Sequence, residues 1–210
     1  MQALTPLQVM QDAPVIPVIV LHDVAHAVPL ARALLAGGIR MLEITLRTSC
    51  ALACMEAIAR EVPEAVVGAG TVRNAADVQA ARKAGARFLV SPGFTPVLSQ
   101  AARAASLPLL PGVATGSEIM AAMDAGHTEL KFFPAAQAGG AAMLKAWAGP
   151  FAEARFCPTG GISAANARDY LALPNVACVG GSWLVPAEAL ARQDWAAITR
   201  LAAEATQLRH

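Results

Sequence analysis

Long hydrophobic runs and an early basic segment are both missing from this sequence. Although 56% of the 210 residues are hydrophobic, no run approaches the roughly 18 consecutive apolar residues that a membrane-spanning helix needs. The first lysine or arginine is Arg32, so the N-terminus lacks the basic region of a secretory signal or transit peptide. We therefore expect a cytoplasmic protein without membrane association.

Cysteine and clustered charge are also scarce. Four cysteines in a chain of this length do not form a disulfide framework, and Cys50 and Cys54 fall in a helical pattern without a matching Cys/His pair. A net charge of +1 without basic clusters gives no electrostatic footprint for nucleic acid. The sequence thus predicts a small-molecule ligand rather than a nucleic acid or a membrane.

Motifs for metal and cofactor chemistry are absent. His22 and His26 could form one ligand pair, but no third ligand has a recognisable spacing and no H-E-x-x-H occurs. The sequence contains no Walker loop, no Gly-x-Ser-x-Gly elbow, and no G-x-G-x-x-G after a strand. We expect neither a metal nor a cofactor.

What the sequence does contain is an even series of eight β-rich runs separated by Ala-rich stretches with helical periodicity. Asn74, Ser117 and Ser163 are candidate helix N-caps. Eight βα units favour a single-domain TIM (β/α)8 barrel over residues 1–210, with a short amphipathic helix at 4–12 covering the N-terminal mouth. The expected strands are 15–21, 41–47, 66–72, 88–93, 109–113, 129–135, 155–161 and 177–184.

Lysine is rare, with three residues against thirteen arginines, and one of the three lies in an apolar strand. Lys131 stands in ELKFFPA (129–135), whereas Lys83 and Lys145 have polar or helical surroundings. Burying an ammonium is costly, and losing its proton leaves an amine nucleophile. A buried lysine paired with a carboxylate is the structural alternative.

The run MLEITLR (41–47) offers a partner for this lysine. Alternation along a strand places Glu43 and Arg47 on the face opposite Leu42, where both would point into the barrel. Lys131 could then reach Glu43, and an amine beside a carboxylate in a dry pocket is suited to carbonyl addition. A purely architectural ion pair remains an open alternative.

Two glycine motifs follow the last two expected strands, T-G-G-I-S (159–163) and V-G-G-S-W-L (179–184). The loops after strands seven and eight of a barrel commonly bind phosphate through backbone N–H groups. Gly160, Gly161, Gly181 and Ser182 are placed for that role. No lysine or arginine stands near either motif in the sequence, so amides and a hydroxyl would have to hold the anion.

Over nearly its whole length, the chain closely resembles the bacterial 2-keto-3-deoxy-6-phosphogluconate (KDPG) and 4-hydroxy-2-oxoglutarate (KHG) aldolases. The resemblance rests on EITLRT (43–48), VGAGTV (67–72), SPG (91–93), KFFPA (131–135), FCPTGGIS (156–163) and GGSWLVP (180–186).

The resemblance implies a trimeric, metal-independent class I lyase of the Entner–Doudoroff pathway. Lys131 would form the Schiff base (imine) with the substrate, and Glu43 would shuttle protons. Arg47, Thr71 and Thr159 would lie at the substrate carboxylate, and the glycine motifs would lie at the phosphate. Its products would be pyruvate with glyceraldehyde 3-phosphate, or with glyoxylate from 4-hydroxy-2-oxoglutarate.

One departure from the family concerns the substrate. After the first strand, where members often carry a basic residue, this chain has Leu21-His22-Asp23, which leaves room for a non-phosphorylated keto acid. Two other functions also stay open: a sugar-phosphate isomerase or epimerase using Glu43 as base, and a non-catalytic keto-acid binder. The sequence does not fix the preferred substrate, the C4 stereochemistry or the oligomeric state.

Overall fold

The computed structural model describes residues 4–209, so residues 1–3 and 210 of the expected domain lie outside the described part. All paired strands are parallel, and helices alternate with them along the chain. The strands are Val15–Ile19 (β1), Met41–Thr45 (β2), Val66–Gly70 (β3), Phe88–Val90 (β4), Leu109–Leu110 (β5), Gly112–Val113 (β6), Glu129–Phe132 (β7), Arg155–Pro158 (β8) and Val179–Gly181 (β9).

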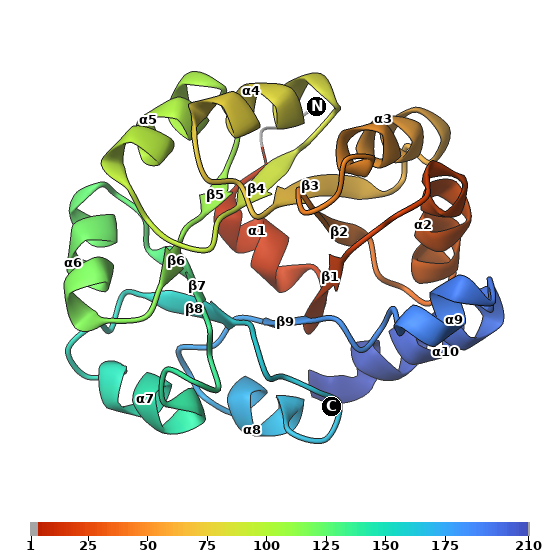
Figure 1. The fold of residues 1–210 in the computed structure, drawn as a ribbon. Coiled ribbons are helices and arrows are strands. Elements are labelled where there is room, and N and C mark those ends of the chain that lie inside the picture. The colour runs from red at the N-terminus through yellow and green to blue at the C-terminus, as the bar shows by residue number, and fades with distance from the viewer. Residues whose placement is uncertain (1–3, 210) are drawn as a thin grey trace.

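Helices surround these strands on the outside (Figure 1). The α-helices are Pro6–Gln11 (α1), Ala27–Ala36 (α2), Ala51–Glu61 (α3), Ala75–Lys83 (α4), Pro96–Ala104 (α5), Gly116–Asp124 (α6), Gly140–Trp147 (α7), Ala167–Leu171 (α8), Ala187–Ala191 (α9) and Trp195–Thr206 (α10). Two short 3-10 helices span Val24–His26 (η1) and Gln207–Arg209 (η2). None of the helices among the described residues is both long and apolar enough to cross a membrane.

The strands form one ladder of six, in the order β5-β4-β3-β2-β1-β9, and one of three, in the order β6-β7-β8. The expected strand 109–113 is divided at Pro111 into β5 and β6, because proline has no N–H to donate to a ladder. Two isolated parallel bridges, Phe156↔Val176 and Thr159↔Gly180, connect the β8 and β9 segments. The structure is therefore an α/β fold with a curled parallel sheet.

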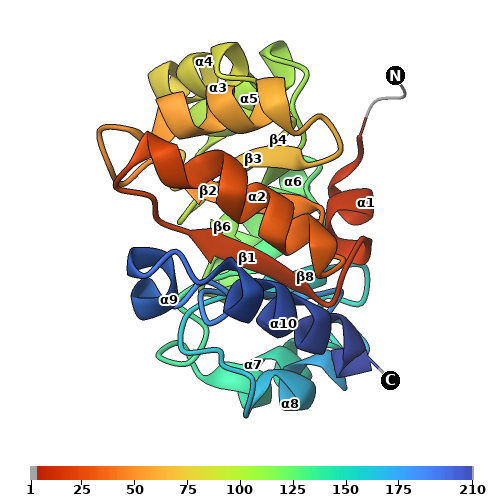
Figure 2. The same cartoon turned by 90° about the vertical axis from the view of Figure 1, so that its right-hand side faces the viewer.

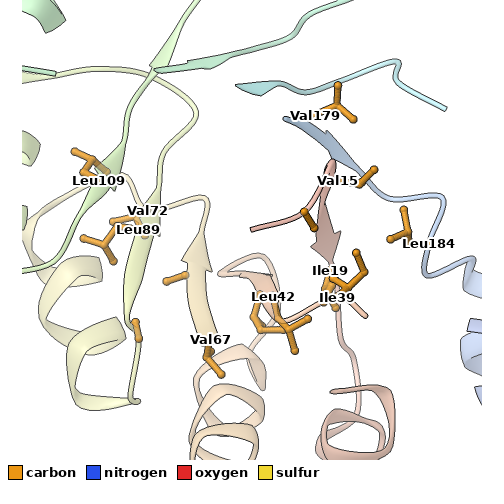
Figure 3. Packing of buried hydrophobic residues seen from close by; sticks show 14 of the residues in the cluster. Val15, Ile19, Ile39, Leu42, Val67, Val72, Leu89, Leu109, Val179 and Leu184 are labelled. Carbon is orange, nitrogen blue, oxygen red and sulfur yellow. The ribbon is translucent and has the colours of Figure 1, made fainter. Parts of the chain in front are cut away.

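Side chains alternate between two hydrophobic clusters on the two faces of the strands. Val15, Leu42 and Leu89 belong to the larger cluster, in which the strands pack against the helices (Figure 3). Ile16, Met41 and the other members of the smaller cluster face the opposite way. The period of two expected for a strand thus separates an outer from an inner core.

Helix α1 packs on the inner core. Thr5 begins it with a capping box, in which its side chain accepts a hydrogen bond from Gln8 N while the Gln8 side chain accepts from Thr5 N. Val9 and Met10 of α1 are fully buried in the smaller cluster. Figure 2 shows α1 beside one end of the strands, as its position directly before β1 requires.

Candidate active site

The two residues expected to carry the chemistry meet in the interior. Lys131 on β7 and Glu43 on β2 are each only 3% exposed, and Lys131 Nζ lies 3.4 Å from Glu43 Oε1. The two residues are 88 positions apart in sequence and lie on strands of different ladders. The curvature of the sheet therefore brings their side chains together. Because water is excluded from both groups, their interaction is much less screened than that of a surface pair.

A glycine on the neighbouring strand makes room for the carboxylate. Glu43 and Gly70 lie on adjacent strands, and a Cβ at Gly70 would overlap Oε1, Cγ and Cδ of Glu43. Any side chain at Gly70 would therefore push the carboxylate away from its present position. Gly70 falls within VGAGTV (67–72), but this role could not be predicted, because close approach between strands leaves no signal in a single sequence.

Phe133 follows Lys131 by two residues and covers it. Lys131 Nζ lies 5.1 Å from the centre of the Phe133 ring, within the range of a cation–π contact. Phe133 lies one residue beyond the end of β7 at Phe132, so its ring reaches Lys131 from the start of the following loop. A cation formed at this nitrogen would meet the electron-rich face of the ring.

Arg47 and Thr71 are paired, but not on strands. β2 ends at Thr45 and β3 ends at Gly70, so the expected strand segments 41–47 and 66–72 are too long. Arg47 Nε donates to Thr71 Oγ1 at 3.0 Å, and Thr71 has a φ of 60°, which is incompatible with extended backbone. The arginine is exposed and points from the loop after β2 rather than from the interior face of the strand.

The residues of both glycine motifs line a cavity of about 160 Å³. Gly160 and Gly161 have φ angles of 100° and 72°, in the left-handed region that favours glycine. The cavity is lined by Val18, Val20, Arg47, Phe133, Thr159, Gly160, Gly161, Ile162, Gly180, Gly181 and Ser182.

Arg47 in this lining corrects one expectation. No basic residue stands near the glycine motifs in the sequence, yet the chain folds so that Arg47, from the loop after β2, lines their cavity. An anion bound there would have both backbone N–H groups and one cation within the same cavity. The sequence did not reveal this contact, because Arg47 lies in the loop after β2, far from both motifs along the chain.

Two cysteines of the inner core lie near this site. Cys157 and Cys178 are buried in the inner core, and Cys157 Sγ lies 3.9 Å from Thr159 Oγ1. Burial, with Cys157 alongside, raises the pKa of Cys178 well above its ordinary value, so its thiol stays protonated at neutral pH. Residues 4–209 contain no group of three or more His, Cys, Asp or Glu side chains arranged to hold a metal.

The comparisons with known proteins agree over almost the full chain. Residues 7–201 match the family model for KDPG and KHG aldolase. The KHG/KDPG aldolase of Escherichia coli K12 is 56% identical over 199 residues, which cover 95% of this chain and 93% of that protein. The 2-dehydro-3-deoxy-phosphogluconate aldolase of Dickeya dadantii is 56% identical over 198 residues, which cover 94% of this chain and 93% of that protein.

Solved structures give the same result. A KDPG aldolase from Legionella pneumophila, with pyruvate captured at low pH as a covalent carbinolamine intermediate, superposes with a TM-score of 0.96 at 48% identity, covering 98% of this chain and all of that one. The KDPG aldolase of Zymomonas mobilis ZM4, solved with 3-phosphoglycerate, gives a TM-score of 0.91 at 51% identity, and the match covers 95% of this chain and 94% of that one. By the family match and these identities, this chain belongs to the KDPG and KHG aldolase family of lyases.

Proposed function

We propose that this protein is a class I aldolase that reversibly cleaves 2-keto-3-deoxy-6-phosphogluconate to pyruvate and glyceraldehyde 3-phosphate. It would also cleave 4-hydroxy-2-oxoglutarate to pyruvate and glyoxylate. The observation that carries the proposal is the buried Lys131–Glu43 pair at 3.4 Å, close to a cavity that Phe133 and Thr159 help to line. The names and bound molecules of the relatives support the choice of substrate.

The reaction starts with the unprotonated amine of Lys131 attacking the C2 carbonyl carbon of the keto acid. The resulting carbinolamine loses water and becomes an iminium, which is the electron sink for the next step. The face of the Phe133 ring, 5.1 Å from the nitrogen, stabilises that positive charge.

Bond cleavage then needs a base at C4. Glu43 removes the proton of the C4 hydroxyl, the C3–C4 electron pair moves toward the iminium, and an aldehyde leaves an enamine on Lys131. The protonated Glu43 returns its proton to C3. Water hydrolyses the iminium, which releases pyruvate and restores the lysine amine.

The remaining residues orient the substrate. Arg47, whose side chain hydrogen-bonds to Thr71, holds the carboxylate next to C2, and Thr159 lies nearby on the same cavity. Gly160, Gly161, Gly181 and Ser182 bind the phosphate of the aldehyde half through backbone N–H groups and a hydroxyl. His22 and Asp23, in place of the basic residues common after strand one, leave this phosphate with less positive charge.

The scaffold proposed for this chemistry is a closed (β/α)8 barrel formed by one domain over residues 1–210. The two bridges between the β8 and β9 segments support closure of the ring, and burial of Val9 and Met10 supports α1 as the cover of its N-terminal mouth. We further propose a homotrimer, which light scattering would test against three times the 21.6 kDa chain mass. The cytoplasmic location remains a prediction from the sequence.

Borohydride reduction with pyruvate, followed by peptide mapping, tests the proposal. We expect one reduced pyruvate adduct on Lys131 and none in Lys131→Ala, which should also lose turnover by at least about a thousandfold. Lys145→Ala, at an exposed lysine of α7, is the matched control and should behave like the wild type. A folded wild-type protein that forms no adduct would instead favour the isomerase function.

A further inference from the structure

A second and larger cavity adjoins the proposed active site. Its volume is about 600 Å³, against about 160 Å³ for the cavity that Arg47 and Phe133 line. The two cavities share Val18, Val20 and Ser182 in their walls. A molecule that extends from Lys131 as far as Ser182 therefore reaches the boundary of the larger space.

Apolar side chains line much of the wall of this second cavity. Val18 and Val20 come from β1 and the residue after it, whereas Trp183, Val185 and Leu190 come from the segment that follows β9. A volume of roughly 300–1,000 Å³ with mainly hydrophobic and aromatic walls is typical of small-molecule sites. The cavity is thus large enough for a substituent much bigger than a phosphate group.

The ionisable side chains in the wall do not form a charged ligand set. Asp23 Oδ1 accepts a hydrogen bond from Ala25 N at 2.9 Å and thereby caps η1. The His26 ring lies edge-on to Trp195, with 5.9 Å between ring centres. With Asp23 and His26 engaged in local structure, the exposed His22 is the third ionisable side chain of the wall, and the other contacts for a ligand are chiefly apolar.

We propose that this larger cavity is a subsite for an apolar, aryl-sized substituent on C4 of the substrate. The inference rests on the proposed function and deepens it: the protein would cleave 4-aryl-4-hydroxy-2-oxobutanoates to pyruvate and an aromatic aldehyde. The bond changes are those given above, with C3–C4 broken and the aldehyde carrying the aryl group. Burial of the ring against Trp183 and Leu190 supplies the binding energy that the phosphate contacts supply for KDPG.

The test compares two substrates in a coupled assay for pyruvate release. One is 4-hydroxy-2-oxo-4-phenylbutanoate, and the other is 4-hydroxy-2-oxoglutarate, whose short aldehyde half does not need the larger cavity. Ala187→Phe fills the cavity from the start of α9, and Leu190→Trp is a second filling variant. Ala196→Phe, at an exposed position of α10 outside both cavities, is the matched control.

We expect the wild type to cleave both substrates. Either filling variant should lower kcat/KM for the phenyl substrate by about tenfold or more and leave that for 4-hydroxy-2-oxoglutarate within about twofold. The subsite is wrong if the wild type cleaves 4-hydroxy-2-oxoglutarate but not the phenyl compound, or if both filling variants match Ala196→Phe. Failure to cleave either substrate, with no pyruvate adduct on Lys131, would instead reject the proposed function itself.

Discussion

At the scale of single residues, the buried Lys131–Glu43 pair is better explained by chemistry than by stability. Desolvating two opposite charges costs several kcal/mol per ion, and their attraction often does no more than offset that cost. Here Gly70 must also lack a side chain for the carboxylate to stay beside the amine. A fold that needed only a filled interior could place apolar residues at all three positions.

Replacing Glu43 with glutamine separates imine formation from bond cleavage. The amide keeps the size of the side chain but cannot accept the C4 hydroxyl proton, so turnover should fall by about 10²–10⁴-fold. Trapping of pyruvate by borohydride should persist, because the Lys131 amine is unchanged. Single-turnover cleavage and adduct yield would be measured together, and cleavage at the wild-type rate would contradict the role of Glu43.

Ser182→Ala tests the phosphate contacts. Loss of a hydrogen bond to a charged group costs about 1.5–3 kcal/mol, which corresponds to a rise in KM of roughly 10- to 100-fold for the phosphorylated substrate. 4-Hydroxy-2-oxoglutarate has no phosphate and should show little change. An equal rise in KM for both substrates would remove Ser182 from the phosphate site.

At the scale of helices and strands, the sequence predicted where most elements begin better than where they end. Asn74 does cap α4, its side chain accepting from Asp77 N. The expected cap at Ser117 is wrong, because Thr115, two residues earlier, accepts from Glu118 N and forms a capping box. Ser163 is also wrong, because α8 starts only at Ala167 and Asn166 is its N-cap.

The strand ends were missed for a related reason. The β-rich runs in the sequence continue through Arg47 and Thr71, but the ladder stops where the backbone turns, and a positive φ at a threonine has no sequence signature. The pairing of Lys131 with Glu43 was predictable because strand alternation in the expected barrel points both side chains to the interior. The proximity of Arg47 to the glycine motifs was not, because it depends on how two distant loops fold back.

We expect His127, which lies two residues before the start of β7, to make the stability of the fold depend on pH. Its Nε2 lies 2.7 Å from Ser99 Oγ of α5, and Phe94 packs edge-on against its ring. Burial, with the charge of Arg103, lowers the pKa of His127, although Glu129 opposes this shift. The unfolded chain therefore binds a proton here more readily than the native protein does. This residue thus lowers the free energy of unfolding as the pH falls below the ordinary histidine pKa of about 6.5.

His127→Gln should remove that dependence. Urea unfolding of the wild type and the variant would be compared at pH 7.5 and pH 5. We expect the stability of the wild type relative to the variant to be lower at pH 5 than at pH 7.5, because glutamine does not titrate. A relative stability that does not change between the two values would show that His127 is not protonated differently on unfolding.

At the scale of the whole molecule, closure of the proposed barrel depends on the contact between the β8 and β9 segments, where strand pairing is least regular. The six- and three-stranded ladders are joined between the β8 and β9 segments by two isolated bridges rather than by a continuous ladder. One of these bridges pairs Thr159 with Gly180, and both residues also line the proposed substrate cavity. Closure of the ring and assembly of the site would therefore occur at the same place.

Gly180→Ala tests this junction, because a Cβ at Gly180 would overlap the Thr159 side chain. If the bridge is needed for closure, the variant should lose about 1–3 kcal/mol of unfolding free energy and bind substrate more weakly, since Thr159 must move. The matched control is Gly93→Ala, because a Cβ at Gly93 meets nothing within 4 Å and the substitution should be close to neutral. Equal free energies of unfolding for the two variants in urea would mean that the Thr159 side chain can move aside without loss of stability. The contact between the β8 and β9 segments would then not hold the barrel closed.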